Sequence, residues 1–159
     1  IGRCGAERSG GAGVSAIGRA DIAAMIPHAG VMCLLDRVLG WDATSIRCAT
    51  VAHRAYDNPL RRAGRLDSIC GIEFAAQAMA VHGRLAGAVD ARPQAGYLAS
   101  VRDVRCEISR LDLLDGELVV SAERLMGDAE QVIYQFALAV AKREILRGRA
   151  AVVLMAPPA

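Results

Sequence analysis

One acidic residue in an otherwise apolar stretch is the feature of this sequence best suited to chemistry. Glu73 lies among small and apolar residues over positions 68–88, with Ile72 and Phe74 on either side. A buried carboxylate is costly to desolvate unless it is paired, hydrogen-bonded or protonated, and such a group suits general acid or base chemistry near neutral pH. Gln77 follows four residues later, on the same helical face, and could orient the carboxyl. The pattern indicates an acid–base residue at Glu73 or, equally, a carboxylate that points to solvent or interacts with the positive end of a helix.

The chain has three histidines that could supply a second proton-transfer group. His53 ends an alternating segment and precedes an arginine-rich stretch, a position from which it could enter a cleft. His28 lies in a Pro-His-Ala-Gly turn. His82 follows Glu73 by more than two helical turns, which is too far for contact. A lone histidine is more often structural than catalytic, so His53 is the strongest candidate of the three.

The residues that open the same segment offer a second kind of chemistry. Amides in the first turn of a helix lack intrahelical acceptors, and they could stabilise negative charge as it develops on a carbonyl oxygen. We expect Asp67 or Ser68 to cap this helix and Gly71 to let a ligand approach closely. Ordinary capping is the alternative. The predicted substrate-binding residues are Ser68, Ile69, Cys70, Gly71 and Gln77.

Four arginines and one acid lie in the polar stretch 54–66. Arg61, Arg62 and Arg65 would suit a phosphate group or an acidic protein partner, because guanidinium groups bind oxyanions through paired hydrogen bonds. A solvated loop is the commoner explanation for such a run. The five cysteines are widely spaced and form no CxxC pair. This spacing disfavours a zinc site or a disulfide framework and favours a reducing, cytoplasmic compartment.

The remaining pattern predicts the elements that position these residues. A short helix is expected over 22–26, capped by Asp21 and ended by Pro27. Apolar or alternating runs predict strands over 31–42, 44–53, 96–109, 117–126, 130–144 and 148–155. The clearest strand would present on one face Val132, Tyr134, Phe136, Leu138 and Val140. One long buried helix and six strands predict an α+β fold in which an antiparallel sheet wraps around the helix.

Length and composition indicate one domain with a partner. The 159 residues are 53% hydrophobic and 23% charged, with a net charge of +2. This is too apolar for disorder and rather apolar for a monomer, so we expect another subunit to cover part of the surface. Nucleic-acid modules are more basic, and no apolar run is long enough to span a membrane. Residues 1–19 are glycine-rich and predict a flexible extension without a secretory signal, followed by a single domain over 20–159.

Three motifs occur in a defined order: Ile26-Pro27-His28, then MCLLDRV over 32–38, then Glu73-Phe74-Ala75-Ala76-Gln77. This order resembles that of the hotdog-fold 3-hydroxyacyl-[acyl-carrier-protein] dehydratases, whose long central helix carries E-x-x-x-Q. The stretch 53–83 is similar to a divergent branch found with aryl polyene and related lipid-like biosynthesis clusters. The resemblance spans about residues 20–155. It implies the hotdog fold, in which a curled antiparallel sheet surrounds one helix.

The resemblance also implies an activity and its partners. A hydro-lyase of this family removes water from a 3-hydroxyacyl chain on the phosphopantetheine arm of an acyl carrier protein, which makes Glu73 one proton-transfer group. The family's catalytic histidine is missing where this chain has Asn58-Pro59, and His53 is the best substitute. The family's sites lie between two subunits, so a second hotdog subunit, identical or different, is implied. No metal and no cofactor beyond the carrier's phosphopantetheine is implied.

Two other functions fit the same sequence. Hotdog proteins also hydrolyse acyl thioesters, with a helical carboxylate that activates water. The third reading is a non-catalytic hotdog subunit that binds acyl chains or stabilises a catalytic partner, and the missing histidine favours it. Loss of water from the substrate, release of a free acid, or no reaction without a second subunit would separate the three.

Overall fold

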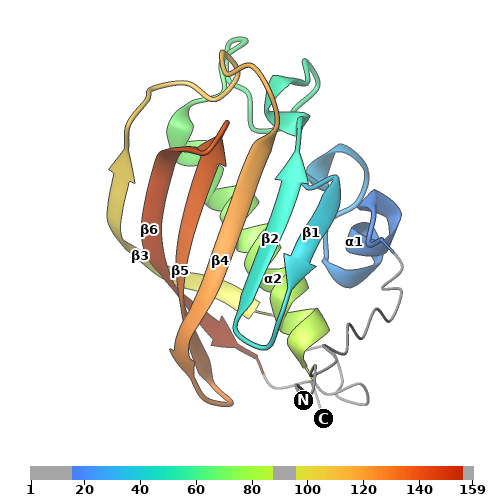
Figure 1. Ribbon diagram of the computed structural model, residues 1–159, viewed down its shortest axis with the longest axis vertical. Coiled ribbons are helices and arrows are strands. Elements are labelled where there is room, and N and C mark those ends of the chain that lie inside the picture. Colours follow the sequence, from blue (N-terminus) through green and yellow to red (C-terminus); the bar gives the residue numbers. More distant parts are fainter. Residues whose placement is uncertain (1–15, 88–95, 156–159) are drawn as a thin grey trace, which may run out of the picture.

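The structure is a computed structural model that describes residues 16–87 and 96–155. Within these residues, six antiparallel strands form one sheet in the order β1-β2-β4-β5-β6-β3. The strands are β1 (Arg37–Trp41), β2 (Ser45–Thr50), β3 (Gly96–Cys106), β4 (Leu118–Gly127), β5 (Gln131–Val140) and β6 (Arg143–Leu154). The sheet curls around one long helix, α2 (Gly71–Ala86), which crosses behind it in Figure 1. The predicted hotdog architecture is confirmed.

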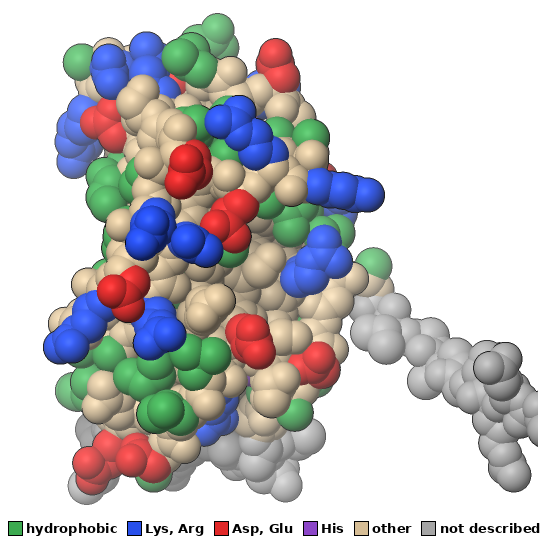
Figure 2. Space-filling view, turned by 60° about the vertical axis from the view of Figure 1, so that its left-hand side comes forward, with side chains coloured by type: hydrophobic (Ala, Val, Ile, Leu, Met, Phe, Trp, Pro, Cys, Tyr) green, Lys and Arg blue, Asp and Glu red, His purple; other side chains and the backbone are tan. Residues whose placement is uncertain are grey.

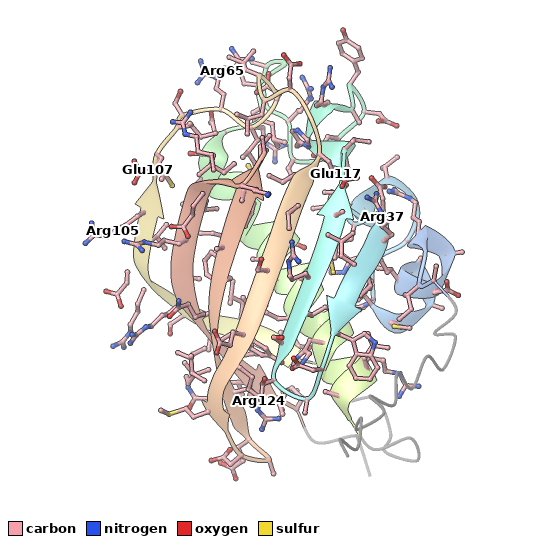
Figure 3. All side chains as sticks on the ribbon, viewed as in Figure 1. Arg37, Arg65, Arg105, Glu107, Glu117 and Arg124 are labelled. Atoms are coloured by element: carbon pink, nitrogen blue, oxygen red, sulfur yellow. The ribbon has the colours of Figure 1, made fainter. Side chains whose placement is uncertain are left out.

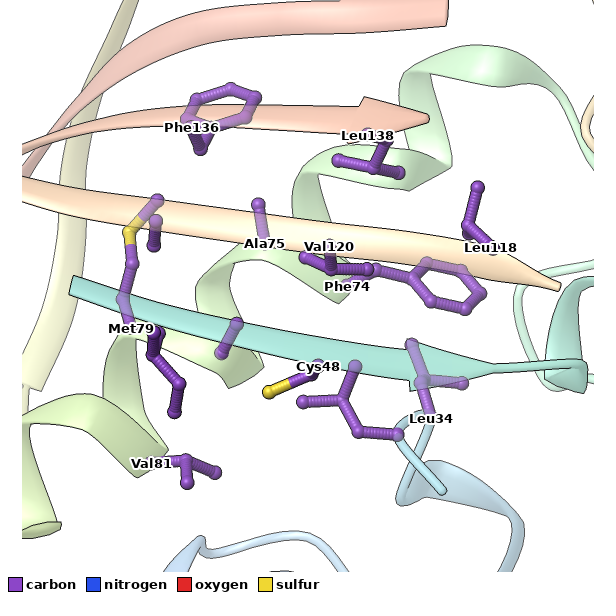
Figure 4. Packing of buried hydrophobic residues seen from close by; sticks show 14 of the residues in the cluster. Leu34, Cys48, Phe74, Ala75, Met79, Val81, Leu118, Val120, Phe136 and Leu138 are labelled. Atoms are coloured by element: carbon purple, nitrogen blue, oxygen red, sulfur yellow. The ribbon is translucent and has the colours of Figure 1, made fainter. Parts of the chain in front are cut away.

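The core fills the space between the concave face of the sheet and α2. Alternation in the strands puts every second side chain on that face. The alternating β2 residues Ile46, Cys48 and Thr50 are buried. Four of the five residues predicted to share a face of β5 are also buried, namely Val132, Tyr134, Phe136 and Leu138. Figure 4 shows the helix residues Phe74, Ala75 and Met79 packed among strand residues such as Val120 and Leu138. Small residues on α2 let the helix lie close to the sheet.

The N-terminal end of the described chain is more ordered than the sequence predicts. Helix α1 (Arg19–Met25) begins earlier than expected, with Gly18 as its N-cap. The Gly18 amide donates to the Asp21 carboxylate across 2.9 Å, so Asp21 lies within the first turn instead of at the cap. Ile17 and Gly18 also pair with β1. The predicted extension over 1–19 is therefore wrong for its last residues, and residues 1–15 lie outside the described part.

Two predicted strand boundaries are wrong. The stretch 31–42 is not one strand, because Gly30–Met32 forms a 3₁₀ helix, η1, and β1 begins only at Arg37. The last two strands meet at Ala141 and Lys142, which have φ angles of 49° and 66°. A two-residue turn with positive φ at both positions is of type I′, for which asparagine and glycine are the usual residues. An Ala-Lys pair therefore gives no turn signal in the sequence.

Charged side chains lie around the rim of the sheet, and one pair of them forms an ion pair. Figure 3 places Arg37 of β1 next to Glu117, and the two form a bidentate ion pair. Arg65 lies at the upper end of the molecule and Arg124 at the lower end. None of the helices in the described ranges is both long and apolar enough to cross a membrane.

Candidate functional site

Glu73 lies in the first turn of α2, and two neighbours hold its carboxyl. Its Oε1 accepts a hydrogen bond from Gln77 Nε2 at 3.2 Å and lies 3.4 Å from His28 Nε2. The Glu73 side chain is 34% exposed, so it is less buried than the apolar sequence around it suggests. The arrangement leaves Oε2 without a hydrogen-bond partner among the described residues.

Gln77 is the residue that ties this carboxyl to the rest of the fold. It is buried, its Oε1 accepts from the Leu34 amide at 2.9 Å, and its Nε2 donates to the Met32 carbonyl at 2.8 Å. An amide N–H can only donate and a carbonyl can only accept, so these two bonds set the orientation of the Gln77 side chain. With that orientation, Nε2 faces Glu73. Gln77 therefore orients the carboxyl and connects α2 to the end of η1 and to Leu34, which follows it.

His28 is a member of this cluster for which the sequence predicted no role. It follows Pro27 directly, at the end of the segment that carries α1, and its side chain is 31% exposed. Its Nδ1 is buried and has no partner among the described residues. No spacing rule relates position 28 to position 73, because they come together only when α1 packs beside α2 (Figure 1).

A cavity of about 870 Å³ opens beside these three residues. Small-molecule sites have volumes of roughly 300–1,000 Å³, with mostly apolar walls and a few polar groups. Here His28, Glu73 and Gln77 are polar groups on one part of the wall, and Met25, Met79, Val152 and Leu154 are among its apolar residues. The cavity suits a largely apolar ligand that brings a reactive group to Glu73.

His82 and Tyr134 also line the cavity, and they hold each other in place. His82 Nε2 lies 3.0 Å from the Asp42 carbonyl oxygen, and Nδ1 lies 2.8 Å from the Tyr134 hydroxyl. Because a carbonyl only accepts, Nε2 carries the proton, and the neutral ring accepts at Nδ1 from the Tyr134 hydroxyl. Burial lowers the pKa of His82 and raises the pKa of Tyr134, so both groups are neutral near pH 7. This pair links α2 to β5 and to the turn after β1.

His53, the predicted second catalytic residue, is in a different environment. It lies in the short 3₁₀ helix η2 (Ala52–Arg54) and is fully buried. Its Nε2 lies 3.3 Å from the Leu114 carbonyl oxygen, and burial lowers the pKa of the ring. His53 does not line the cavity and does not contact Glu73 within this chain. A pairing of the two residues between subunits stays a prediction.

The backbone amides at the start of α2, which were predicted to bind a ligand, form hydrogen bonds within the protein. A 3₁₀ helix, η3 (Ser68–Cys70), continues α2 backwards, with Asp67 as its N-cap. The Ser68 amide donates to the Ser109 carbonyl and the Cys70 amide to the Asp67 carbonyl. These two amides are therefore engaged inside the protein and are not directed toward a ligand.

Gly71 faces the sheet and not a ligand site. A Cβ at this position would lie 2.5 Å from Leu146 Cδ2 and 2.8 Å from Leu138 Cδ2. The glycine is needed because the helix approaches β5 and β6 closely here. Ile69 is more than half exposed, and Cys70 is half-buried with a pKa raised by burial; neither lines the cavity.

The three predicted anion-binding arginines divide into two kinds. Arg61 is mostly buried and donates to the Gly64 carbonyl at 2.9 Å and to the Arg54 carbonyl at 3.1 Å, so it holds the loop together. Arg62 and Arg65 flank a tight turn and are exposed, and Arg65 lies 3.2 Å from Asp67. Of the three, only Arg62 and Arg65 have exposed side chains that a large partner could contact.

A second cleft of about 910 Å³ lies beside the same loop. Arg19 and Arg54 line it, but each is paired with an acid, at 3.0 Å to Asp36 and 3.5 Å to Asp115 respectively. The positive charge in this cleft is therefore largely balanced. Among the described residues, no cluster of three or more histidine, cysteine or acidic side chains is arranged to hold a metal ion.

An antiparallel sheet curled around a helix that carries a carboxylate beside an apolar cavity defines a hotdog-fold protein. The family model for ApeP-like proteins, described as ApeP dehydratase, matches residues 20–158. The chain therefore belongs to the ApeP-like dehydratase family, which agrees with the resemblance in its motifs. No curated protein matches the sequence.

Solved structures with similar folds include a dehydratase and several thioesterases. The dehydratase heterocomplex ApeI:P from Xenorhabdus doucetiae aligns with a TM-score of 0.71 and 21% identity, covering 85% of this chain and 91% of that chain. A thioesterase family protein from Silicibacter pomeroyi aligns with a TM-score of 0.60 and 14% identity, covering 87% and 96%. A mutant thioesterase from Pseudomonas aeruginosa aligns with a TM-score of 0.56 and 12% identity, covering 75% and 80%. At these identities the likeness shows a shared fold.

Proposed function

We propose that this chain dehydrates 3-hydroxyacyl thioesters presented by an acyl carrier protein, and that Glu73 is a proton-transfer residue of the reaction. The observation that carries the proposal is the Glu73 carboxyl, held by Gln77 at the surface of a cavity of about 870 Å³. Membership of a dehydratase family supports the reaction class. The ApeI:P heterocomplex, which has the same fold, is a dehydratase.

The reaction needs two proton transfers close together. One group takes a proton from C2 of the acyl chain, and another gives a proton to the hydroxyl that leaves from C3. Glu73 Oε1 is already bonded to Gln77, so Oε2 is the oxygen that would meet the substrate. The apolar wall of the cavity would hold the acyl chain, because burial of its methylene groups is favourable.

We also propose that the exposed arginines Arg62 and Arg65 meet the acidic carrier protein or the phosphate of its arm. Replacing both with serine should raise KM for a carrier-bound substrate and leave KM for the same acyl group on free pantetheine unchanged. Arg61 is unsuitable for this test because its guanidinium holds two loop carbonyls. An unchanged KM for the carrier-bound substrate in the double variant would contradict the docking role.

A second hotdog subunit is proposed to bind along β3. This strand pairs with β6 on one side and is an edge of the sheet as described. Figure 2 brings the β3 side forward and shows charged side chains across its middle and hydrophobic ones gathered below. Tyr97 and Leu98 of β3 are 58% and 41% exposed, which favours cover by another subunit. Tyr97→Asp should weaken a dimer or heterodimer in size-exclusion chromatography; a monomeric wild-type chain that binds no hotdog subunit would oppose this proposal.

Glu73→Gln is the test of the proposed reaction. Purified protein, alone and with a second hotdog subunit, is incubated with a 3-hydroxyacyl-carrier protein, and the product is weighed by mass spectrometry. Loss of one water from the wild-type reaction is expected, with a rate about 10²–10⁴-fold lower in Glu73→Gln. Glu123→Gln is the matched control, since Glu123 is an exposed residue of β4 that does not line the cavity.

Three outcomes would redirect the proposal. A free acid as product would favour a thioesterase. No product from this chain with or without a second hotdog subunit would favour a non-catalytic subunit. An undiminished rate in Glu73→Gln would remove Glu73 from the site.

A further inference from the structure

We infer that His28 is the second proton-transfer residue, so that one chain carries both groups that dehydration needs. This rests on the proposed function, because it names the partner of Glu73 in the same reaction. The sequence places this role on His53, and the family's usual histidine is missing. Three observations about the histidines of this chain lead to His28.

The first observation is access. The chain has three histidines, and all of them are described. His53 and His82 have no exposed surface, whereas the His28 side chain is 31% exposed and lines the same cavity as Glu73. A group that transfers a proton to or from a substrate must reach it within about 2.6–3.2 Å. Of the three histidines, only His28 is exposed at the cavity wall beside Glu73.

The second observation is freedom to exchange a proton. In His82, the Asp42 carbonyl keeps a proton on Nε2, and the Tyr134 hydroxyl occupies Nδ1. The Nε2 of His53 likewise faces a carbonyl, that of Leu114. A nitrogen that donates to a carbonyl cannot accept a proton without losing that bond. His28 Nε2 has no carbonyl partner within residues 16–87 and 96–155, and it faces the Glu73 carboxyl.

The third observation is the distance between His28 and Glu73. His28 Nε2 lies 3.4 Å from Glu73 Oε1, so a proton can pass between them with a small movement of either side chain. Gln77 fixes the carboxyl side of this pair, and Pro27 restricts the backbone immediately before the imidazole. The two groups are therefore held next to each other at the cavity wall before substrate arrives.

The step balances with these two residues alone. His28 Nε2 takes the C2 proton, and the C2–H electron pair becomes the C2=C3 bond. The C3–O bond breaks, and its electron pair leaves with the hydroxyl, which takes a proton from the Glu73 carboxyl. The products are the 2-enoyl thioester and water. Transfer of the proton from His28 Nε2 to Glu73 restores the starting pair.

A plain ion pair is the other explanation for the contact. Pairs that are about one third exposed contribute only about 0–1 kcal/mol to stability, so removing His28 would then change little. The apolar residues Ile22 and Ile26 already anchor the neighbouring helix α1 in the core. A structural role and a catalytic role for His28 therefore predict different experimental results.

The test compares His28→Gln with His53→Gln in the assay of 3-hydroxyacyl-carrier-protein dehydration, with the second hotdog subunit present. Glutamine retains a polar group in both places but cannot act as a base. We expect kcat to fall about 10²–10⁴-fold in His28→Gln, with an unchanged Tm. We expect His53→Gln to lower the Tm while kcat changes less than about threefold, because His53 is buried away from the cavity.

Chemical rescue with imidazole is a second test, because added imidazole can replace a missing proton-transfer group but cannot replace a missing structural contact. His28→Ala leaves room beside Glu73, and added imidazole should restore part of kcat, with saturation. If the wild type is active, Glu73→Gln is inactive and His28→Gln is fully active, this inference fails and the proposed function stands. If kcat falls in His53→Gln and not in His28→Gln, the inference also fails, and the pairing of His53 with Glu73 between two subunits is supported instead. If the wild type shows no dehydration, both fail together.

Discussion

One methyl group at the start of α2 would test how closely the helix is held to the sheet. In Gly71→Ala, the new Cβ would meet Leu146 Cδ2 at 2.5 Å and Leu138 Cδ2 at 2.8 Å. Carbon atoms pack best at about 3.5–4.0 Å, so the helix or the leucines must move by roughly 1 Å. Overpacking of this kind costs about 1–3 kcal/mol, and the helix preference of alanine over glycine offsets up to about 1 kcal/mol. We expect a net loss of about 1–2 kcal/mol in the free energy of unfolding.

The same helix offers a matched control. Gly83 lies in the interior of α2, and a Cβ there would have no heavy atom within 4 Å. Gly83→Ala therefore gains the helix preference without the clash, which should raise stability by about 0.5–1 kcal/mol. The two variants should differ by about 1.5–3 kcal/mol, which is roughly 3–12 °C in Tm for a domain of this size.

Urea and thermal denaturation measure this difference. Turnover of Gly71→Ala should fall as well, because Glu73 is two residues away and moves with the helix start. Leu146→Ala removes the nearer clash, so it should cost less in Gly71→Ala than in the wild type. Equal stability of Gly71→Ala and Gly83→Ala would refute the reasoning, since it would mean that the sheet yields to the new methyl group at no cost.

Three further predictions follow from buried polar groups. Gln77→Leu leaves two backbone groups unpaired and should lower stability by about 2–4 kcal/mol and reduce turnover, as measured by urea denaturation and product formation; a variant as stable and active as the wild type would contradict this. Tyr134→Phe removes the partner of His82 Nδ1 and should cost about 1–2 kcal/mol, which an unchanged urea midpoint would disprove. Burial lowers the pKa of His53 and His82 below the unfolded value of 6.5, so the unfolded chain binds more protons below that pH. The free energy of unfolding should therefore be highest above about pH 6.5 and should decrease as the pH falls from 6.5 toward the pKa values of the folded state. A urea midpoint that stays constant when the pH is lowered from about 6.5 would oppose this.

Most of the fold could be predicted because its signals are local. Alternation over 131–140 identifies both the strand and its buried face, and the long run of small and apolar residues around Phe74 identifies a helix enclosed by protein. The boundaries that failed lack local signals. The turn at Ala141 and Lys142 has positive φ angles, which neither alanine nor lysine favours. The pairing of the flanking strands imposes these angles.

The candidate site was predictable only where its members share one element. Glu73 and Gln77 are one helical turn apart, so their proximity follows from the period of the helix. The helix-start amides were expected to face a ligand, but η3 continues the helix and engages two of them. Whether a backbone amide is free depends on which distant carbonyl the fold brings to it, here that of Ser109.

The sequence by itself determined the class of fold and the family and predicted the acidic residue of the candidate site, because periodicity, composition and short motifs are properties of neighbouring residues. Only the tertiary structure decided which histidine stands beside that acid. His28 reaches Glu73 because α1 packs near α2 and because Gln77 bonds to the segment that follows η1. His53 is buried by the same folding. Contacts between distant segments result from the packing of the whole core, and no pattern within either segment contains them.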